Sequence, residues 1–353
     1  MFRHSLPADL AEEFAATLFP RYRARRSNSR RFAVATAATV GLMAATALLN
    51  RHLAKKAERD NPPAGRFIEV DGVRLHYVVH GRGEPLVLLH GNGSMIQDFG
   101  SSGLLSMASE KYRVIAFDRP GFGHSSRPRG RMWTPQAQAD LIHEALRQIG
   151  IGPAIVLGHS WGASVAAALA LRHPPAVRGL VLASGYYFPT ARADVVLLSG
   201  PAVPVIGDIL SYTLAPLLSR AVWPLLMRKI FGPAPIPAKF GGFPKAMAVR
   251  PSQIRASAAE SAFMIPNAMV EREKYQTLKM PVAIVAGQED RLIPIDEQSA
   301  RLHAEIAQST LHRIAGAGHM VHQTAPGAVM SAIERVDRVP HLRRPEQRRA
   351  SIS

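Results

Sequence analysis

Three side chains that lie far apart in the sequence, Ser160, Asp290 and His319, could together carry out nucleophilic catalysis. A serine hydroxyl is a weak nucleophile at neutral pH, so it needs an imidazole that takes its proton and a carboxylate that orients the imidazole. Ser160 is the centre of a Gly-His-Ser-Trp-Gly segment, and His319 lies in a glycine-rich loop. This set of side chains predicts acyl transfer through a serine nucleophile.

The segments around Ser160 predict a strand, a sharp turn and a helix. An apolar run at 154–157 precedes the serine, and an alanine-rich segment at 163–172 follows it. The flanking glycines allow the helix to begin close to the strand, and the serine must then take a strained backbone conformation. Its hydroxyl would be exposed at a helix N-terminus, where free N–H groups favour developing negative charge.

Strands are also expected before the other two side chains. The apolar run at 281–287 is typical of a buried strand, and Asp290 follows it, at the carboxyl edge of the expected sheet. A shorter strand is expected at 310–314, and His319 comes next in the segment Gly-Ala-Gly-His-Met. The imidazole would therefore lie on a loop before the last helix.

The order serine, aspartate, histidine, with these spacings, resembles the α/β-hydrolase superfamily over about residues 67–336. The resemblance implies a mainly parallel sheet covered by helices on both faces, and the alternating strand and helix signals favour the same fold. It also implies an oxyanion hole made by the backbone N–H groups of Asn92 and Trp161. Asn92 follows a His-Gly turn after the apolar run 85–89. Loss of one such donor typically costs about 10²–10³ in rate.

The octet Asp-Arg-Pro-Gly-Phe-Gly-His-Ser at 118–125 is similar to the loop that follows the fourth strand in that superfamily. Asp118 is a second candidate acid. Its place in a tight turn favours a structural role, in which its side chain accepts hydrogen bonds from backbone N–H groups. His124 is expected to be a loop histidine rather than a base.

The strand signals stop between residues 186 and 275, where proline and bulky apolar residues are frequent. Ninety residues are far more than an ordinary connection needs, so we predict a helical cap at 186–275 inserted between two core segments, 66–185 and 276–338. Part of its apolar content would face Ser160 and form a pocket for an apolar small-molecule substrate.

Composition and charge limit the classes of partner. The 353 residues contain no Cys, which excludes a thiolate nucleophile, and no metal-ligand spacing or dinucleotide signature is present, so we expect no cofactor and no metal. The net charge is +17, but residues 1–59 carry 11 Lys and Arg against 4 Asp and Glu, and residues 334–353 carry 6 against 3. Basic ends without an aromatic platform favour membrane-flanking or solvated tails over nucleic-acid binding.

The 18 residues from Phe32 to Leu49 carry no charge. A helix of that length spans about 27 Å, close to the hydrocarbon thickness of about 30 Å. We predict a single-pass transmembrane helix at 32–49, between a basic N-terminal region at 1–31 and a linker at 50–65, with a basic tail at 339–353. A cleaved signal sequence or an alanine-rich helix packed on the domain are the alternatives. The slight excess of basic residues before the segment favours an N-terminus on the inside.

The predicted function is a membrane-anchored serine hydrolase that cleaves an apolar carboxylic ester or related acyl compound through an acyl-enzyme. Hydrolysis of a C–C bond in a dicarbonyl ring-cleavage product uses the same three side chains and is an alternative. Relatives that hydrolyse epoxides or remove halogens usually carry Asp where this chain has Ser160. A hydrolase fold that has lost its catalytic activity and serves as a membrane-tethered binding protein is a third possibility.

Overall fold

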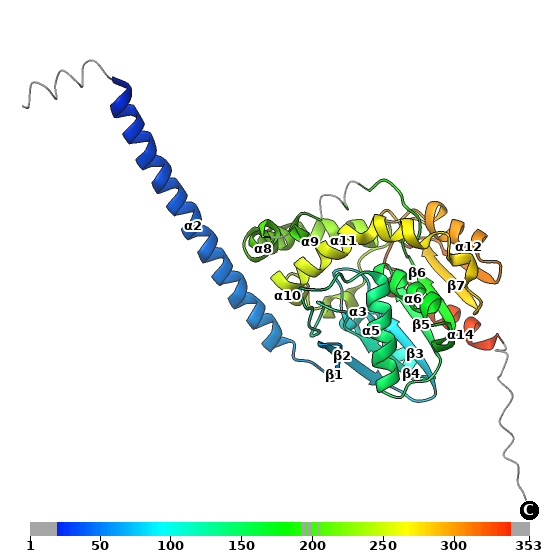
Figure 1. Cartoon of the computed structure of the whole chain (residues 1–353). Helices are drawn as coiled ribbons and strands as arrows, with labels where there is room; N and C mark the ends of the chain where they lie inside the picture. The colour runs from blue at the N-terminus through cyan, green and yellow to red at the C-terminus, as the bar shows by residue number, and fades with distance from the viewer. Residues whose placement is uncertain (1–19, 193–194, 196–198, 204, 340–353) are drawn as a thin grey trace, which may run out of the picture.

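A computed structural model describes residues 20–192, 195, 199–203 and 205–339. Most of the expected basic N-terminal region at 1–31, and all but the first residue of the expected basic tail at 339–353, lie outside the described residues. The described chain forms a globular part with one long helix projecting from it (Figure 1).

One mainly parallel sheet of eight strands forms the centre of the globular part, in the order β1-β2-β4-β3-β5-β6-β7-β8. β1 and β2 form an antiparallel hairpin, β2 is antiparallel to β4, and all other neighbours are parallel. The strands are β1 (Arg66–Val70), β2 (Val73–His80), β3 (Glu84–Leu89), β4 (Tyr112–Phe117), β5 (Ala154–His159), β6 (Val177–Ala183), β7 (Val282–Gly287) and β8 (Ser309–Ile314). β5 and β7 are buried at every residue, as their continuous apolar runs predict.

Helices cover both faces of the sheet (Figure 1). Successive side chains of a strand point to opposite faces, so Val87 of β3 packs in the cluster with α5 and α6, while Leu88 packs in the cluster with α3, α4 and α14. These helices, with two short ones, are α3 (Ile96–Ser102), α4 (Leu104–Ser109), α5 (Pro135–Gln148), α6 (Trp161–Arg172), α12 (Arg301–Glu305), α13 (Val321–Thr324) and α14 (Pro326–Arg338). Single turns of 3-10 or π type lie at Pro174–Ala176, Gly200–Ala202, Ala238–Gly242, Tyr275–Thr277 and Asp296–Ala300.

A group of helices inserted between β6 and β7 forms the cap over the sheet. They are α8 (Ile206–Tyr212), α9 (Leu214–Phe231), α10 (Lys245–Ala248) and α11 (Pro251–Glu271). α8 and α9 meet at an angle of 59°. Many apolar side chains of this pair are exposed, among them Ile206, Ile209, Leu218 and Leu225.

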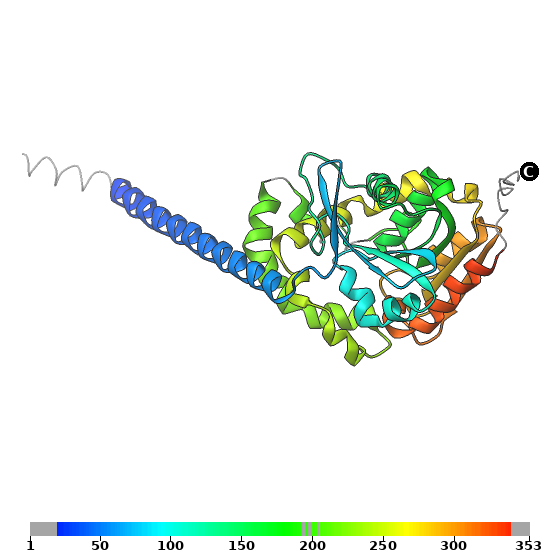
Figure 2. The same ribbon diagram turned by 90° about the horizontal axis from the view of Figure 1, so that it is seen from below.

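The long helix α2 (Pro20–Asp60) is the one described helix that is long and apolar enough to cross a membrane. Its apolar segment lies away from the globular part, and the side chains of Phe32 and Leu48 are 75% and 67% exposed. Figure 2 shows α2 leaving the globular part beside the cap helices.

The prediction of a linker at 50–65 is wrong for residues 50–60, because α2 continues without a break to Asp60. Residues 51–59 are mainly good helix formers, and Pro62 disfavours helix only in the residue directly before it. The last turns of α2 dock on the globular part. Asn50 donates from Nδ2 to the carbonyl oxygens of Tyr212 (3.1 Å) and Thr213 (2.7 Å).

Candidate active site

Ser160 has the strained backbone that the surrounding glycines predict. It lies between β5 and α6 with φ 53° and ψ −120°, a region that residues other than glycine rarely adopt. A Cβ on Gly158 would overlap the carbonyl group of Gly162, and a Cβ on Gly162 would overlap the carbonyl oxygen of Leu89. Only glycine at both positions lets the helix begin this close to the sheet.

The structure brings Ser160, His319 and Asp290 together. His319 Nε2 lies 3.0 Å from Ser160 Oγ, and its Nδ1 lies 2.8 Å from Asp290 Oδ2. The other carboxylate oxygen, Asp290 Oδ1, accepts hydrogen bonds from the N–H groups of Leu292 (2.8 Å) and Ile293 (2.9 Å). The three side chains come from the ends of β5, β7 and β8, and all three residues are buried. An imidazole in this position can accept the serine proton while the carboxylate fixes its tautomer.

The loop of His319 is held from two sides. Its N–H donates to the carbonyl oxygen of Ile230 at the end of α9 (2.9 Å), so the cap contributes directly to the position of the imidazole. Its carbonyl oxygen accepts a hydrogen bond from His159 Nε2 (3.1 Å). Burial, together with the neighbouring His322, holds the pKa of His159 well below its ordinary value, so the ring is neutral and Nε2 carries the proton.

The two N–H groups expected to form the oxyanion hole are free of protein acceptors within the described chain, both at Asn92 and at Trp161. The turn before Asn92 lies against Ser160, because a Cβ on Gly91 would lie 3.1 Å from Ser160 Cβ. Asn92 is fixed by the cap, since its Nδ2 donates to Ser257 O (3.1 Å) and Ser261 Oγ (3.2 Å). Both N–H groups are therefore available to an oxygen bound beside Ser160.

A buried arginine holds the turn that carries Asn92. Arg119 is fully buried and donates to the carbonyl oxygens of His90 (2.7 Å) and Gly91 (2.9 Å). Its guanidinium also forms an ion pair with Glu260 of α11, which links the turn to the cap. Burial and the charge of Arg119 lower the pKa of His90 to about 3. The neutral ring accepts from the N–H of Arg119 at Nε2 (3.0 Å) and donates from Nδ1 to Gly91 O (2.8 Å).

Asp118 has the structural role expected from the sequence. Its carboxylate accepts hydrogen bonds from the N–H groups of Ile96 (2.9 Å) and His124 (3.0 Å), and it lies 2.7 Å from His76 Nδ1. The sequence does not indicate the network of Arg119 and Glu260 beside it. Arg119 and Glu260 are 141 residues apart, and no local pattern marks either residue as buried.

One group among the described residues has metal-ligand types close together: Asp98, His159 and His322, whose ligand atoms all lie within 4.8 Å of one another. All three are buried behind the loop of His319, and His322 Nε2 lies 3.1 Å from Asp98 Oδ1. Ser94 and Gln323 also donate to the Asp98 carboxylate (2.8 and 2.7 Å). Ser94 and Gln323 already satisfy the carboxylate, so we interpret the group as a polar support for the loop of His319.

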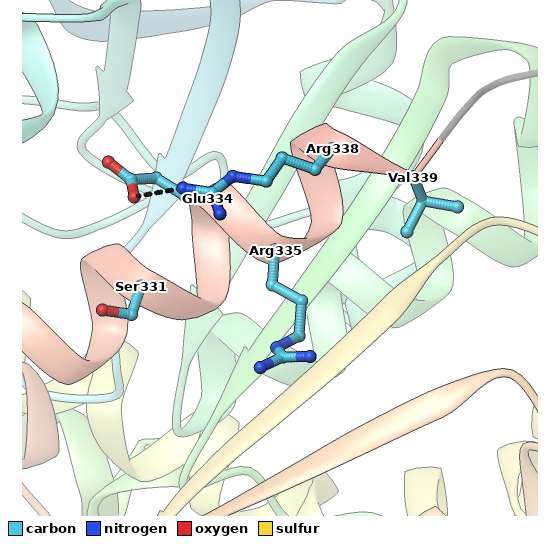
Figure 3. A pocket seen from close by; sticks show the side chains of 5 residues that line it. All are labelled: Ser331, Glu334, Arg335, Arg338 and Val339. Carbon is cyan, nitrogen blue, oxygen red and sulfur yellow. Dashed lines mark hydrogen bonds and ion pairs between the residues drawn. The ribbon is translucent and has the colours of Figure 1, made fainter.

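Apolar side chains of the cap lie next to the loops that carry Asn92 and His319. One cluster joins Met95, close after Asn92, and Met320, directly after His319, to α9, α10 and the turn before α10, through Met227, Phe231, Phe240, Phe243, Met247 and Ala248. Ala57 of α2 belongs to the same cluster. By contrast, a surface pocket of about 540 Å³ on the outer side of α14 has no residue near Ser160; it is lined by Ser331, Glu334, Arg335, Arg338 and Val339 (Figure 3).

Comparison with known proteins shows the family to which this fold belongs. Residues 84–326 match the family model for the alpha/beta hydrolase fold. The chain is 30% identical over 267 residues, 74% of its length and 90% of the relative, to the 2-hydroxymuconate semialdehyde hydrolase of Pseudomonas sp. (strain CF600). A thermophilic esterase structure from Thermogutta terrifontis matches with TM-score 0.62 and 21% identity, over 77% of this chain and 97% of the esterase.

A third likeness extends beyond the globular part. The crystal structure of a membrane phospholipase A, described as a bacterial virulence factor, matches with TM-score 0.60 and 21% identity, over 89% of this chain and 99% of that one. Residues 66–353 make up less than 89% of the chain, so the matched region must include part of α2.

Proposed function

Because the chain belongs to the alpha/beta hydrolase fold family, we propose that it is a serine hydrolase that cleaves a carboxylic ester of an apolar acyl group. The observation that carries the proposal is the continuous contact from Asp290 through His319 to Ser160, at 2.8 Å and 3.0 Å. A binding protein without catalysis would have no need to hold a serine in a strained conformation beside an oriented imidazole.

In this proposal His319 takes the Ser160 proton as the serine oxygen attacks the acyl carbon. The oxyanion of the tetrahedral intermediate accepts hydrogen bonds from the N–H groups of Asn92 and Trp161. His319, now charged and stabilised by Asp290, gives the proton to the departing alcohol. Water then attacks the acyl-enzyme by the same route and frees the carboxylic acid.

The substrate class rests on the apolar cluster over the catalytic loops. Met95 and Met320 lie in the loops that carry Asn92 and His319, and Ala57 connects the same cluster to the base of α2. We propose that an acyl chain lies along this cluster and enters from the side of α2, which suits an ester of the membrane lipid phase. The likeness to a membrane phospholipase A supports this proposal at the level of the fold.

The second candidate is hydrolysis of a C–C bond in a dicarbonyl compound. It is favoured by the 30% identity to a hydrolase of 2-hydroxymuconate semialdehyde. Both reactions use a serine, a histidine and an aspartate, so the substrate separates them. The ester proposal predicts that kcat/KM rises with the chain length of the acyl group in an ester series. It also predicts that these esters have a higher kcat/KM than a vinylogous dicarbonyl acid.

The decisive experiment labels the full-length protein with a fluorophosphonate probe and measures hydrolysis of an ester series. Ser160→Ala should abolish both signals, because the three groups act as a unit. Ser106→Ala, a change at an exposed serine, is the matched control and should retain both. Undiminished labelling of the Ser160→Ala protein would contradict the assignment of the nucleophile.

We further propose that α2 anchors the protein in a membrane as a single-pass helix. The segment from Phe32 to Leu49 has seven strongly apolar residues, each contributing about −0.3 to −0.6 kcal/mol at most. A central arginine costs about 2.5–3.5 kcal/mol, so Val40→Arg should move the protein from the membrane pellet to the soluble fraction, whereas Val40→Leu should not. Release of the unaltered chain by carbonate would contradict the anchor.

A further inference from the structure

A pocket of about 420 Å³ lies where the base of α2 meets the cap and the loop after β4. Its charged lining is strongly basic: Glu58, Arg74, Arg127, Arg129, Arg250 and Arg255. The pocket has no residue in common with the arrangement around Ser160, so it is a separate site.

The carboxylates near the pocket do not balance its arginines. Glu58 pairs with Arg250 (2.6 Å), and Asp208 of α8 pairs with both Arg129 (3.2 Å) and Arg255 (2.7 Å). Among the described residues, no carboxylate lies within ion-pair distance of the two remaining lining arginines, at positions 74 and 127. An excess of positive charge therefore faces the cavity.

The unpaired arginines are positioned by other contacts. The guanidinium of Arg74 stacks on the ring of Phe67 at 3.5 Å, and Arg127 donates to the carbonyl oxygen of Pro120 (2.9 Å). Burial lowers the pKa of Arg127 to about 10, which still leaves it charged at neutral pH. Burial also lowers the pKa of His124, the one histidine of the lining, so it adds no charge there at pH 7.

The N-terminus of α11 also lies at this cavity. α11 has 21 residues and begins at Pro251, and Ser252 in its first turn lines the pocket. The first N–H groups of a helix have no partner in the helix, and the dipole favours an anion there. Guanidinium groups match the oxygens of a phosphate in pairs, so this combination suits a phosphate better than a lone carboxylate.

The pocket lies at the level of the predicted membrane surface. Tyr212 lines it, and the carbonyl oxygen of Tyr212 accepts the hydrogen bond from Asn50, the residue directly after the apolar segment. Glu58, at another side of the pocket, is eight residues further along α2, about 12 Å at 1.5 Å per residue. The pocket thus begins at the hydrocarbon boundary and continues through the head-group layer, which is about 5–8 Å thick on each side.

We propose that this pocket binds a phosphate group, supplied by the head group of an anionic phospholipid in the membrane that α2 enters. Such a contact would hold the cap against the bilayer. The lipid source rests on the proposed anchor, whereas the phosphate chemistry does not, and neither depends on hydrolysis.

The test uses the full-length chain with Ser160→Ala in a neutral detergent, so that no ligand is hydrolysed. Thermal unfolding is followed with inorganic phosphate, with dihexanoyl phosphatidylglycerol, with dihexanoylglycerol, and with chloride at matched ionic strength. The two phosphate compounds should raise the Tm by about 2–4 °C at saturation, and the other two should not.

Arg74→Gln combined with Arg127→Gln should remove that shift. The matched control is Arg82→Gln, an exposed arginine beyond the other end of β2, about 26 Å from Arg74 at 3.3 Å per residue. If the double variant does not fold, Arg74→Gln alone, at an exposed side chain, should still weaken binding at least several-fold.

The outcomes separate the parts of the proposal. No shift beyond that of chloride, or an equal shift in the double variant, overturns the phosphate site. An equal shift with dihexanoylglycerol also overturns it, because the apolar cap would then be the binding surface. A shift with inorganic phosphate and none with the phospholipid confirms the site and overturns the lipid source. Loss of ester turnover in Ser160→Ala leaves each of these results unchanged.

Discussion

Two buried carboxylates each contact the Nδ1 atom of a histidine. The contact that the other ring nitrogen, Nε2, makes distinguishes the roles of the two pairs. Asp290 lies 2.8 Å from His319 Nδ1, and Asp118 lies 2.7 Å from His76 Nδ1. The far nitrogen of His319 meets the Ser160 hydroxyl, whereas the far nitrogen of His76 accepts from the N–H of Gly65 (3.2 Å). Only the first pair is connected to a serine hydroxyl.

Asp290→Asn should lower kcat for ester hydrolysis by about 10⁴-fold, because the amide no longer fixes the productive tautomer or stabilises the charged imidazole. Asp118→Asn is the matched control and should keep kcat within a few-fold. Steady-state kinetics on both purified variants, with folding checked by circular dichroism, decides the matter. A folded, inactive Asp118→Asn protein beside an active Asp290→Asn protein would reverse the two roles.

The stability that Asp118 provides should depend on pH. Burial alone would raise its pKa, but hydrogen bonds from His76 and from the N–H of Ile96 outweigh burial and lower it. A carboxyl with a lowered folded pKa stabilises the fold above its unfolded value of about 3.9, and this contribution is lost as the pH falls through the folded pKa. Urea unfolding should therefore show a smaller penalty for Asp118→Asn at pH 3 than at pH 7. Equal penalties would contradict this.

Among the elements, the cap does more than cover the sheet, because two of its helices hold the loop of His319 and the turn of Asn92. The end of α9 accepts the N–H of His319 through Ile230 O, and α11 reaches the turn of Asn92 through the pair of Glu260 and Arg119. A movement of the cap would therefore shift His319, the proposed base, together with Asn92, a proposed oxyanion donor.

Glu260→Gln should lower the free energy of unfolding by about 3–5 kcal/mol, because it leaves the fully buried Arg119 without its counter-charge. Adding Arg119→Met should recover part of the loss, since a buried pair replaced by apolar residues can be nearly neutral. Denaturant unfolding of the two variants measures the difference. Glu144→Gln, which removes an exposed helical pair, should change little, and an equal effect there would contradict the argument.

At the scale of the whole molecule, the boundary between anchor and globular part lies at Asn50 rather than in a flexible segment. Ala57 is buried in the cap cluster, and Glu58 pairs with Arg250. The globular part is therefore held close to the point where α2 would leave the bilayer.

Removal of residues 1–49 should give a protein that stays soluble without detergent and keeps the proposed ester hydrolysis at the level of the full-length chain. Removal of residues 1–60 should lower the Tm by several degrees, because it uncovers the apolar cluster around Ala57 and leaves Arg250 unpaired. Thermal unfolding of the two truncated proteins, with activity measured on the same samples, tests this. Equal Tm values would show that residues 50–60 contribute nothing to the fold.

The local sequence determined the sheet and the chemistry around Ser160. Apolar runs specify buried strands, and the glycines at 158 and 162 specify the turn, because both effects act between neighbours in the chain. Asp290 and His319 were predictable for the same reason, since each follows a strand whose carboxyl end must lie at the edge where Ser160 lies.

Only the tertiary structure decided the contacts between distant segments. Arg119 and Glu260 pair across 141 residues, and the base of α2 gains its partners from α8, α10 and the start of α11. Such pairs leave no periodic signal in the sequence, because a buried charge is stabilised by a partner that lies near it only in the folded structure. The prolines after Asn61 are a local reason for α2 to end at Asp60. The docking of α2 against the cap depends instead on the apolar surface that the cap presents when folded.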